Sequence, residues 1–273
     1  MTRATDGQYR NIRFELDGSI ATLTFDQPET RNAISDADMI EEIVHALSSI
    51  PTRPEISVLI VTGAGKAFSS GGNVKKMRER GGIFAGGALD VQQSYRTGIQ
   101  RIPLQLYELE VPVIAAVNGA AIGAGFDISL MCDIRLASTE AKFGETFLNL
   151  GIIPGDGGAW FLPRALGHQR AAELTFTGRI VEAQEALDLG IVLEVVEPEQ
   201  LLPRARALAE RIADRPPQAL RAAKRLLRAG QDMSLPRFLD YCAAIQAGCH
   251  QTEDHLEALD AFFEKRPGRY QGR

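Results

Sequence analysis

Two short apolar runs, each followed closely by a stretch of small residues, constrain the fold of this chain most strongly. The first run, residues 58–61 (VLIV), precedes residues 66–73 (KAFSSGGN), and the second, residues 113–117 (VIAAV), precedes residues 118–127 (NGAAIGAGFD). Runs of this kind are typical of buried strands. The small residues after them let main-chain N–H groups approach a ligand closely. Two such groups directed at one carbonyl oxygen form an oxyanion hole, so the pattern indicates chemistry on an activated acyl group.

The N-terminal part of the chain combines a hairpin pattern with a helix pattern. In residues 13–25, apolar residues alternate around Asp17 and Gly18, which predicts a β-hairpin. Ser35 is the expected N-cap of a helix that runs to about Leu47, because apolar residues recur at helical spacing after it.

Strand and helix patterns then alternate until the strand patterns stop. A long helix with a kink at Pro103 is expected over residues 90–108, and after about Leu201 only helix patterns remain. Strands that alternate with helices indicate βα units and parallel strands. We therefore expect an α/β core in residues 1–200 and a helical C-terminal region in residues 201–273.

Composition excludes several classes of function. The chain has 273 residues, of which 45% are hydrophobic, and this is enough to bury a sizeable core. Its formal net charge of -5 does not favour nucleic-acid binding. Cys132, Cys242 and Cys249 have no CxxC spacing, and the four histidines are scattered, so we expect a reducing compartment and no metal site. Residues 1–14 have no apolar signal segment and no run is long enough to span a bilayer, so we expect a cytoplasmic protein outside the membrane.

Six further stretches, taken in order, carry a resemblance to a known family. They are residues 31–35 (RNAIS), 66–72 (KAFSSGG), 111–119 (VPVIAAVNG), 131–137 (MCDIRLA), 150–155 (LGIIPG) and 261–266 (AFFEKR). Over nearly the whole chain this series resembles the crotonase superfamily, also called the enoyl-CoA hydratase/isomerase family. The resemblance implies a ClpP-like spiral of ββα units and an acyl-CoA thioester as substrate, with no cofactor beyond its coenzyme A. It also implies that the C-terminal helices cover the coenzyme A site and form homotrimers or dimers of trimers.

The resemblance assigns roles to three positions in the two small-residue stretches. It implies that the backbone N–H groups of Ser70 and Ala124 stabilise a thioester enolate, and that Asp127 transfers a proton. Asp127 lies three residues after Ala124, at the start of an expected helix, so the two residues share roughly one helical face. The unpaired amides and the dipole at a helix N-terminus favour negative charge there. A carboxyl group in this place can exchange a proton close to the developing enolate.

The resemblance also implies a binding surface for coenzyme A. Arg31, Lys66 and Lys265 are the expected cations for its phosphates, with Lys265 supplied by a neighbouring subunit. The matching positions expected to contact coenzyme A are Arg31, Ala33, Lys66, Phe68, Gly71, Phe262 and Lys265.

The chain departs from the pattern of the family's hydratases at one catalytic position. Those hydratases use two glutamates around one water; the first falls at Asp127 and the second at Phe147, which cannot transfer a proton. One carboxyl group suffices to move a double bond, because the same group removes and returns the proton. We therefore expect double-bond isomerisation, with Phe147 and Trp160 as apolar walls for a bulky or cyclic acyl group.

Two alternatives remain open. Either Glu145 or Asp156 replaces the missing glutamate, and the chain is an enoyl-CoA hydratase. Glu145 would share a face with Phe147 on a strand, and Asp156 occupies the place of a small residue in a P-G-x-G-G loop. The second alternative, from another class, is a protein that binds acyl-CoA without catalysis.

Overall fold

The strands of this protein form two sheets, which position the small-residue stretches. The computed structural model describes residues 4–5 and 9–273. The seven-stranded sheet has the order β1 (Ala4–Thr5), β2 (Ile12–Asp17), β3 (Ile20–Phe25), β4 (Val58–Gly63), β6 (Val113–Val117), β8 (Ile134–Ser138) and β11 (Glu194–Val196). The four-stranded sheet has the order β10 (Ile180–Glu182), β9 (Lys142–Gly144), β7 (Ala120–Ile122) and β5 (Ala67–Ser69).

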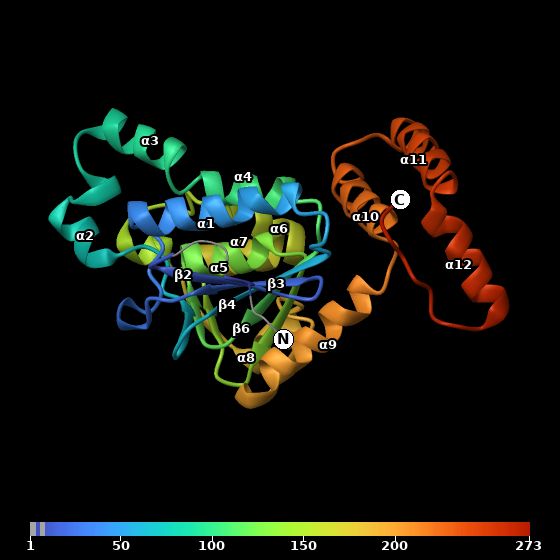
Figure 1. The fold of residues 1–273 in the computed structure, drawn as a ribbon. Helices are drawn as coiled ribbons and strands as arrows, with labels where there is room; N and C mark the ends of the chain where they lie inside the picture. The colour runs from blue at the N-terminus through green and yellow to red at the C-terminus, as the bar shows by residue number, and fades with distance from the viewer. Residues whose placement is uncertain (1–3, 6–8) are drawn as a thin grey trace.

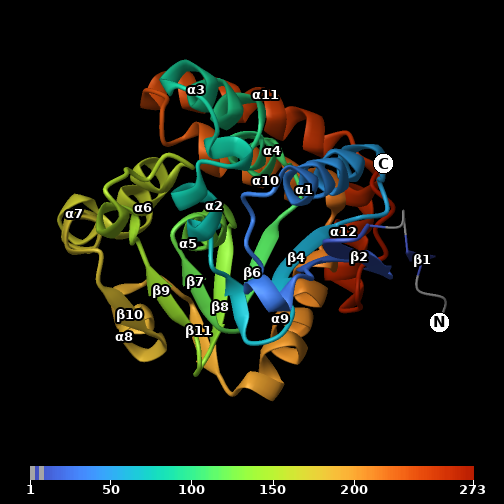
Figure 2. The same cartoon turned by 90° about the vertical axis from the view of Figure 1, so that its left-hand side faces the viewer.

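Each turn of the core adds one strand to each sheet before the chain enters a helix. The pairs β4 and β5, β6 and β7, and β8 and β9 follow one another in this way, with parallel neighbours in both sheets. The hairpin expected in residues 13–25 is present as β2 and β3. The observed topology is the expected spiral of ββα units (Figure 2). It brings the segments after β5 and β7 side by side, because these two strands pair.

Helices cover the sheets and connect the turns of the spiral. In the core they are α1 (Ala37–Ser49), α2 (Val74–Glu79), α3 (Ala88–Thr97), α4 (Arg101–Glu108), α5 (Ala124–Met131), α6 (Gly158–Leu166), α7 (His168–Thr177) and α8 (Ala183–Leu189). Short 3₁₀ turns are η1 (Pro28–Thr30), η2 (Ile50–Thr52), η3 (Gly82–Phe84) and η4 (Phe147–Leu150). No helix in the described part of the chain is both long and apolar enough to cross a membrane.

Two local expectations from the sequence need correction. Asp36, and not Ser35, precedes α1, and the Ser35 hydroxyl instead accepts a hydrogen bond from the Asn73 N–H at 2.8 Å. The expected long helix ends at Gly98 and restarts as α4, so no kink forms at Pro103. Pro103 lies in the first turn of α4, where a missing N–H removes no helical hydrogen bond.

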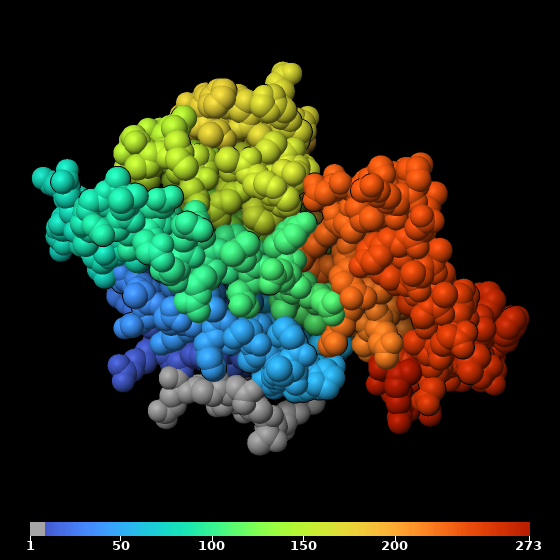
Figure 3. Space-filling model, turned by 90° about the horizontal axis from the view of Figure 1, so that it is seen from above, coloured from blue at the N-terminus to red at the C-terminus, as the bar shows by residue number. Residues whose placement is uncertain are grey.

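The C-terminal helices divide into one that covers the core and three that stand apart. They are α9 (Pro198–Ala213), α10 (Pro217–Ala229), α11 (Leu235–His250) and α12 (Glu253–Glu264). Side chains alternate across β4, so that Leu59 joins the larger core cluster while Val58 packs with Leu201 of α9 on the other face. By its packing α9 therefore belongs with the core, and the separate helical region begins at α10 instead of residue 201 (Figures 1 and 3).

Candidate active site

The segment after β5 is fastened to the loop that precedes α1. The buried Asn32 side chain donates through Nδ2 to the Ala67 carbonyl at 2.8 Å. The Ser69 hydroxyl donates to the Asn32 carbonyl at 2.7 Å and accepts from the Gly71 N–H at 3.1 Å. These bonds fix the backbone of the first small-residue stretch beside the sheet.

Within this stretch, the free amide belongs to Gly72 and not to Ser70. The Ser70 N–H donates to the Arg31 carbonyl at 2.8 Å, so the expectation that it forms an oxyanion hole does not fit this structure. The Gly72 N–H has no hydrogen-bond partner among the described residues. Ala124 is the first residue of α5, where N–H groups lack an acceptor within the helix. Gly71 packs so closely against this helix start that a Cβ on it would lie 2.9 Å from the Ala124 nitrogen.

Two buried carboxyl groups meet behind the Ala124 amide. Asp127, in the first turn of α5, is fully buried and accepts a hydrogen bond through Oδ2 from the Gly158 N–H at 3.0 Å. Glu145 follows β9 and is 1% exposed. A Cβ on Gly158 would overlap both Asp127 Oδ1 and Glu145 Oε1. The two carboxyl groups therefore lie together against the first residue of α6.

This pair is satisfied by a proton. Asp127 Oδ1 and both Glu145 oxygens are buried without any donor from the described residues, apart from a proton held by the pair itself. Burial, and then the charge of Glu145, raises the pKa of Asp127 well above its ordinary value. Burial raises the pKa of Glu145 to about 7, against the lowering effect of its hydrogen bond with Asp127. The two carboxyl groups therefore share a proton near neutral pH.

Asp156 adds a third buried carboxyl group to this acid cluster. It is 6% exposed, its Oδ1 has no partner among the described residues, and burial raises its pKa to about 6. Burial raises the pKa of Tyr95 in α3, and the charge of Asp156 raises it further. No cation contributes to the pKa of Asp127, Glu145 or Asp156. Among the residues described, no group of three or more His, Cys, Asp or Glu side chains is arranged to hold a metal ion.

Apolar side chains enclose the free amides and the acids. The buried Phe147 ring lies 3.6 Å from where a Cβ of Gly123 would stand, directly before Ala124. A Cβ on Gly72 would overlap the Met77 side chain. Phe84 packs edge-on against Tyr95, with ring centroids 6.4 Å apart.

Sequence reasoning missed the contribution of residues 74–97 to this site. Met77 and Phe84 come from α2 and η3, for which the sequence indicated no role in the site, and Tyr95 comes from α3, within the helix expected over residues 90–108. No periodic pattern marks these three side chains as site residues. The Gly72 amide, which is unpaired among the described residues, does lie within the first small-residue stretch that the sequence indicated.

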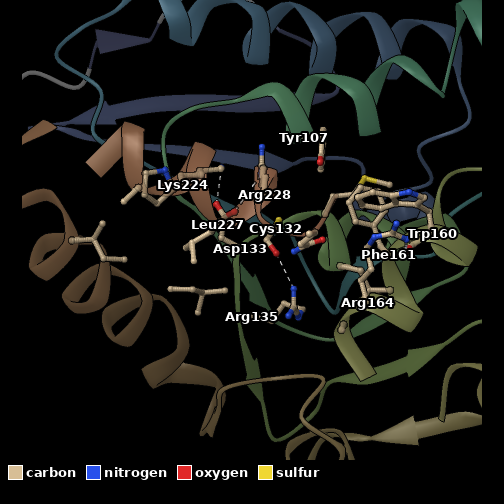
Figure 4. Close-up of a pocket in the computed structure, with 18 of the residues that line it drawn as sticks. Tyr107, Cys132, Asp133, Arg135, Trp160, Phe161, Arg164, Lys224, Leu227 and Arg228 are labelled. Carbon is tan, nitrogen blue, oxygen red and sulfur yellow. Dashed lines mark hydrogen bonds and ion pairs between the residues drawn. The ribbon is translucent and has the colours of Figure 1, made fainter. Parts of the chain in front are cut away.

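Trp160 lies in a different cavity from the acid cluster. This cavity of about 450 Å³ separates α6 from α10 (Figure 4). The Trp160 ring packs edge-on against Tyr107, with centroids 5.3 Å apart, and the Arg164 guanidinium lies 3.7 Å from its centre. The neighbouring Phe161 ring lies 3.1 Å from where a Cβ on Gly157 would stand. The structure thus brings Phe147, but not Trp160, to the carboxyl groups.

The residues expected to bind coenzyme A are dispersed in a single chain. Arg31 and Lys66 are exposed on the core, whereas Phe262 and Lys265 lie on and after α12, which stands apart (Figure 1). Ala33 is buried, and Gly71, which directly precedes the free amide of Gly72, adopts a positive φ of 74°. The Phe68 side chain is wholly buried against Phe25, so its expected contact with coenzyme A is wrong for the side chain.

Comparisons with known proteins agree with this arrangement. Residues 15–273 match the family model described as Enoyl-CoA hydratase/isomerase. The chain is 35% identical to the short-chain-enoyl-CoA hydratase of Clostridium acetobutylicum, over 95% of this chain and 97% of the relative. It is 34% identical to the (E)-benzylidenesuccinyl-CoA hydratase of Thauera aromatica, over 96% of this chain and 99% of that relative. The crystal structure of enoyl-CoA hydratase from Bacillus anthracis superimposes with a TM-score of 0.89 at 35% identity, covering 97% of this chain and 100% of that one.

Proposed function

The chain belongs to the enoyl-CoA hydratase/isomerase family of acyl-CoA enzymes, and we propose that it hydrates the double bond of a 2-enoyl-CoA thioester. One observation carries the proposal: the buried carboxyl groups of Asp127 and Glu145 lie together beside the start of α5. Hydration needs a base for water and an acid for the α-carbon. Glu145 supplies the second acid–base group that Phe147 cannot.

The free amides of Gly72 and Ala124 hold the thioester oxygen. Ala124 begins α5, whose positive dipole end stabilises a developing enolate, and Gly72 directly follows Gly71, which packs against the Ala124 nitrogen. Oxyanion-hole donors of this kind each contribute roughly 3–4 kcal/mol to transition-state stabilisation. The close packing of Gly71 on α5 keeps the two strand ends together.

The shared proton gives the two carboxyl groups different tasks. Asp127, whose pKa burial raises well above its ordinary value, protonates the α-carbon. Glu145, with a pKa of about 7, accepts the proton that water loses as its oxygen bonds to the β-carbon. The step leaves Asp127 ionised and Glu145 protonated. Proton transfer across the contact restores the starting state.

Double-bond isomerisation is the second candidate, and Phe147 is the observation that favours it. The Phe147 ring forms an apolar wall against Gly123 at the position of the second hydratase glutamate. An apolar wall there excludes water from the γ-carbon side, and Asp127 alone then removes and returns the proton.

A crotonyl-CoA assay separates the two candidates. Hydration consumes the conjugated absorbance and yields 3-hydroxybutyryl-CoA, and we expect Glu145→Gln to lower this rate at least about 100-fold. Glu140→Gln, a matched change of an exposed acid in the same region, keeps the rate. If the enzyme instead converts 3-butenoyl-CoA to crotonyl-CoA and Glu145→Gln retains that activity, the isomerase assignment replaces hydration. Tight acyl-CoA binding without turnover of either substrate leaves only a binding protein.

Coenzyme A binding and assembly are linked in this proposal. Arg31 and Lys66 bind coenzyme A phosphates together with Lys265 from another subunit, and no further cofactor takes part. The C-terminal helices expose large apolar side chains, including Leu256, Phe262 and Phe263, which support burial between subunits of a homotrimer or a dimer of trimers. Light scattering at low and high salt, with Phe262→Ser as the variant, measures that assembly.

A further inference from the structure

Asp156 is a buried carboxyl group that the proposed hydration does not use. It is 6% exposed, and Oδ1 meets no donor among the described residues. Glu145 and Asp127 are hydrogen-bonded to each other, whereas no group among the described residues does the same for Asp156 Oδ1. Leaving a buried acceptor unpaired costs about 1–3 kcal/mol, and more for a charged group.

The neighbours of Asp156 show which space it faces. On one side, Gly155 is held by a hydrogen bond from Gln100 Nε2 to its carbonyl at 2.9 Å, and a Cβ on Gly155 would lie 3.4 Å from the Tyr95 ring. On the other side, Gly158 contacts Asp127 and Glu145. A Cβ on Gly155 would contact Tyr95 and one on Gly158 would meet the acid pair, so residue 156 lies between α3 and that pair, and its charge raises the pKa values of all three groups.

A bound substrate can supply the hydrogen-bond donor that the Asp156 carboxyl group lacks. A hydrocarbon acyl chain brings no donor, so it leaves Asp156 unpaired in a site that it also closes to water. An acyl group with a hydroxyl supplies the donor. A site built to hydrogen-bond a substrate hydroxyl discriminates strongly against the analogue that lacks it, because the protein group is then left unpaired.

We propose that Asp156 is a specificity-determining residue that accepts a hydrogen bond from a hydroxyl on the γ-carbon, so that the preferred substrate is a 4-hydroxy-2-enoyl-CoA. This inference rests on the proposed function, because the α- and β-carbons must lie at Asp127 and Glu145. Asp156 adjoins that pair, and the γ-carbon is the next atom of the acyl chain. A neutral hydroxyl fits better than an ammonium group, since the surroundings of all three acids disfavour charge.

The test compares 4-hydroxycrotonyl-CoA with crotonyl-CoA, two substrates that differ by one hydroxyl. We expect the unmodified enzyme to favour the hydroxylated substrate in kcat/KM by about 10- to 100-fold, as one hydrogen bond to a charged acceptor allows. Asp156→Ala removes that preference by slowing the hydroxylated substrate and sparing or speeding crotonyl-CoA. Asp156→Asn retains an acceptor oxygen and most of the preference.

Three results overturn the inference. They are an unmodified enzyme that prefers crotonyl-CoA, an unchanged preference in Asp156→Ala, and an equal loss on both substrates in that variant. Thermal unfolding measures whether each variant folds. If Asp156→Ala does not fold, the substrate preference of the unmodified enzyme still tests the inference. If neither substrate turns over, the proposed function fails. Calorimetry with 4-hydroxybutyryl-CoA and butyryl-CoA then still decides, since equal affinities contradict the role of Asp156.

Discussion

Two regions of this protein bury charged side chains, and they resolve the problem in opposite ways. Where α10 meets the core, Lys224 donates to the Val111 carbonyl at 2.6 Å and pairs with Asp133 at 2.6 Å. Arg228 pairs with the same carboxylate at 3.2 Å. We call Lys224, Asp133 and Arg228 the α10 anchor (Figure 4). No cation among the described residues pairs with the acid cluster of Asp127, Glu145 and Asp156, and burial raises the pKa of each of its carboxyl groups.

The contrast separates a structural use of buried charge from a chemical one. Charges that are paired and hydrogen-bonded, as in the α10 anchor, hold two elements together. Acids that are buried without cations keep protons near neutral pH, where they can exchange them with a substrate. In this protein the paired charges join α10 to the core, whereas the buried acids without a cation lie at the proposed active site.

The two regions also respond to pH with opposite signs. Burial raises the pKa of Glu145 from 4.5 to about 7, so the folded state holds a proton that the unfolded chain loses. Its contribution to stability is full below about pH 4.5 and is lost as pH rises to about 7. Burial lowers the pKa of Lys224 from 10.5 to about 8. The contribution of this group to the free energy of unfolding therefore increases as the pH rises from about 8 to 10.5.

The largest expected effect comes from replacing Asp127 of the acid cluster, with Asp133 of the α10 anchor as the comparison. Asp127→Asn removes the group that protonates the α-carbon, and we expect kcat for the true substrate to fall about 1000-fold. Asp133→Asn, six residues away in the anchor, leaves kcat within about twofold. Steady-state kinetics on folded protein measures both, and equal losses would erase the distinction between the regions.

Separating the acid pair with one methyl group is the next largest change. Gly158→Ala places a Cβ where Asp127 Oδ1 and Glu145 Oε1 now lie, and we expect kcat to fall about 100-fold. Gly248→Ala is the matched helical control, because no atom lies within 4 Å of its new Cβ. That control keeps full activity and gains up to about 1 kcal/mol of stability. Full activity in Gly158→Ala would show that the contact between the acids is not required.

The α10 anchor is tested by its stability. Asp133→Asn leaves the buried Lys224 amine beside a neutral amide, and we expect a loss of about 2 kcal/mol in the free energy of unfolding. Urea unfolding measures the loss. A variant as stable as the unmodified protein would mean that the ion pairs do not hold α10 to the core.

The smallest expected effect is a pH-dependent gain in stability. Glu145→Gln removes a carboxyl group whose ionisation is unfavourable in the fold, so the variant gains on the order of 1 kcal/mol relative to the unmodified protein between pH 5 and pH 8. Thermal unfolding at both values detects it. A relative gain that shrinks with rising pH would contradict the raised pKa of Glu145.

The sequence predicted the spiral and most of the carboxyl groups, but not how they meet. Alternating strand and helix patterns and the small-residue stretches located β4, β6 and α5, because these are local signals. Asp127 and Glu145 are joined through Gly158, a contact between three separate segments that no local pattern encodes. The Ser70 amide was expected to be free for a related reason, since the Arg31 carbonyl to which it donates comes from a distant loop.

The expected isomerase preference rested on the absence of a second acid, and Glu145 weakens that reason. Residue types alone decided the sequence-based choice, whereas the burial and contacts of Glu145 support the proposed hydration. Trp160 was expected beside the acyl group, and Gly158, two residues before it, does contact the acid pair. The Trp160 ring itself lines the cavity next to α10.

The central claim is that Asp127 moves a proton at the α-carbon beside the amides of Gly72 and Ala124. Exchange of the α-hydrogens of butyryl-CoA in deuterated water, followed by mass spectrometry, tests it without requiring hydration or isomerisation. We predict slow but measurable exchange of one α-hydrogen by the unmodified protein, through the form in which the pair's proton lies on Glu145 and Asp127 is ionised, and a loss of about 1000-fold in Asp127→Asn. Exchange by Asp127→Asn at the unmodified rate, or none by the unmodified protein, would contradict it.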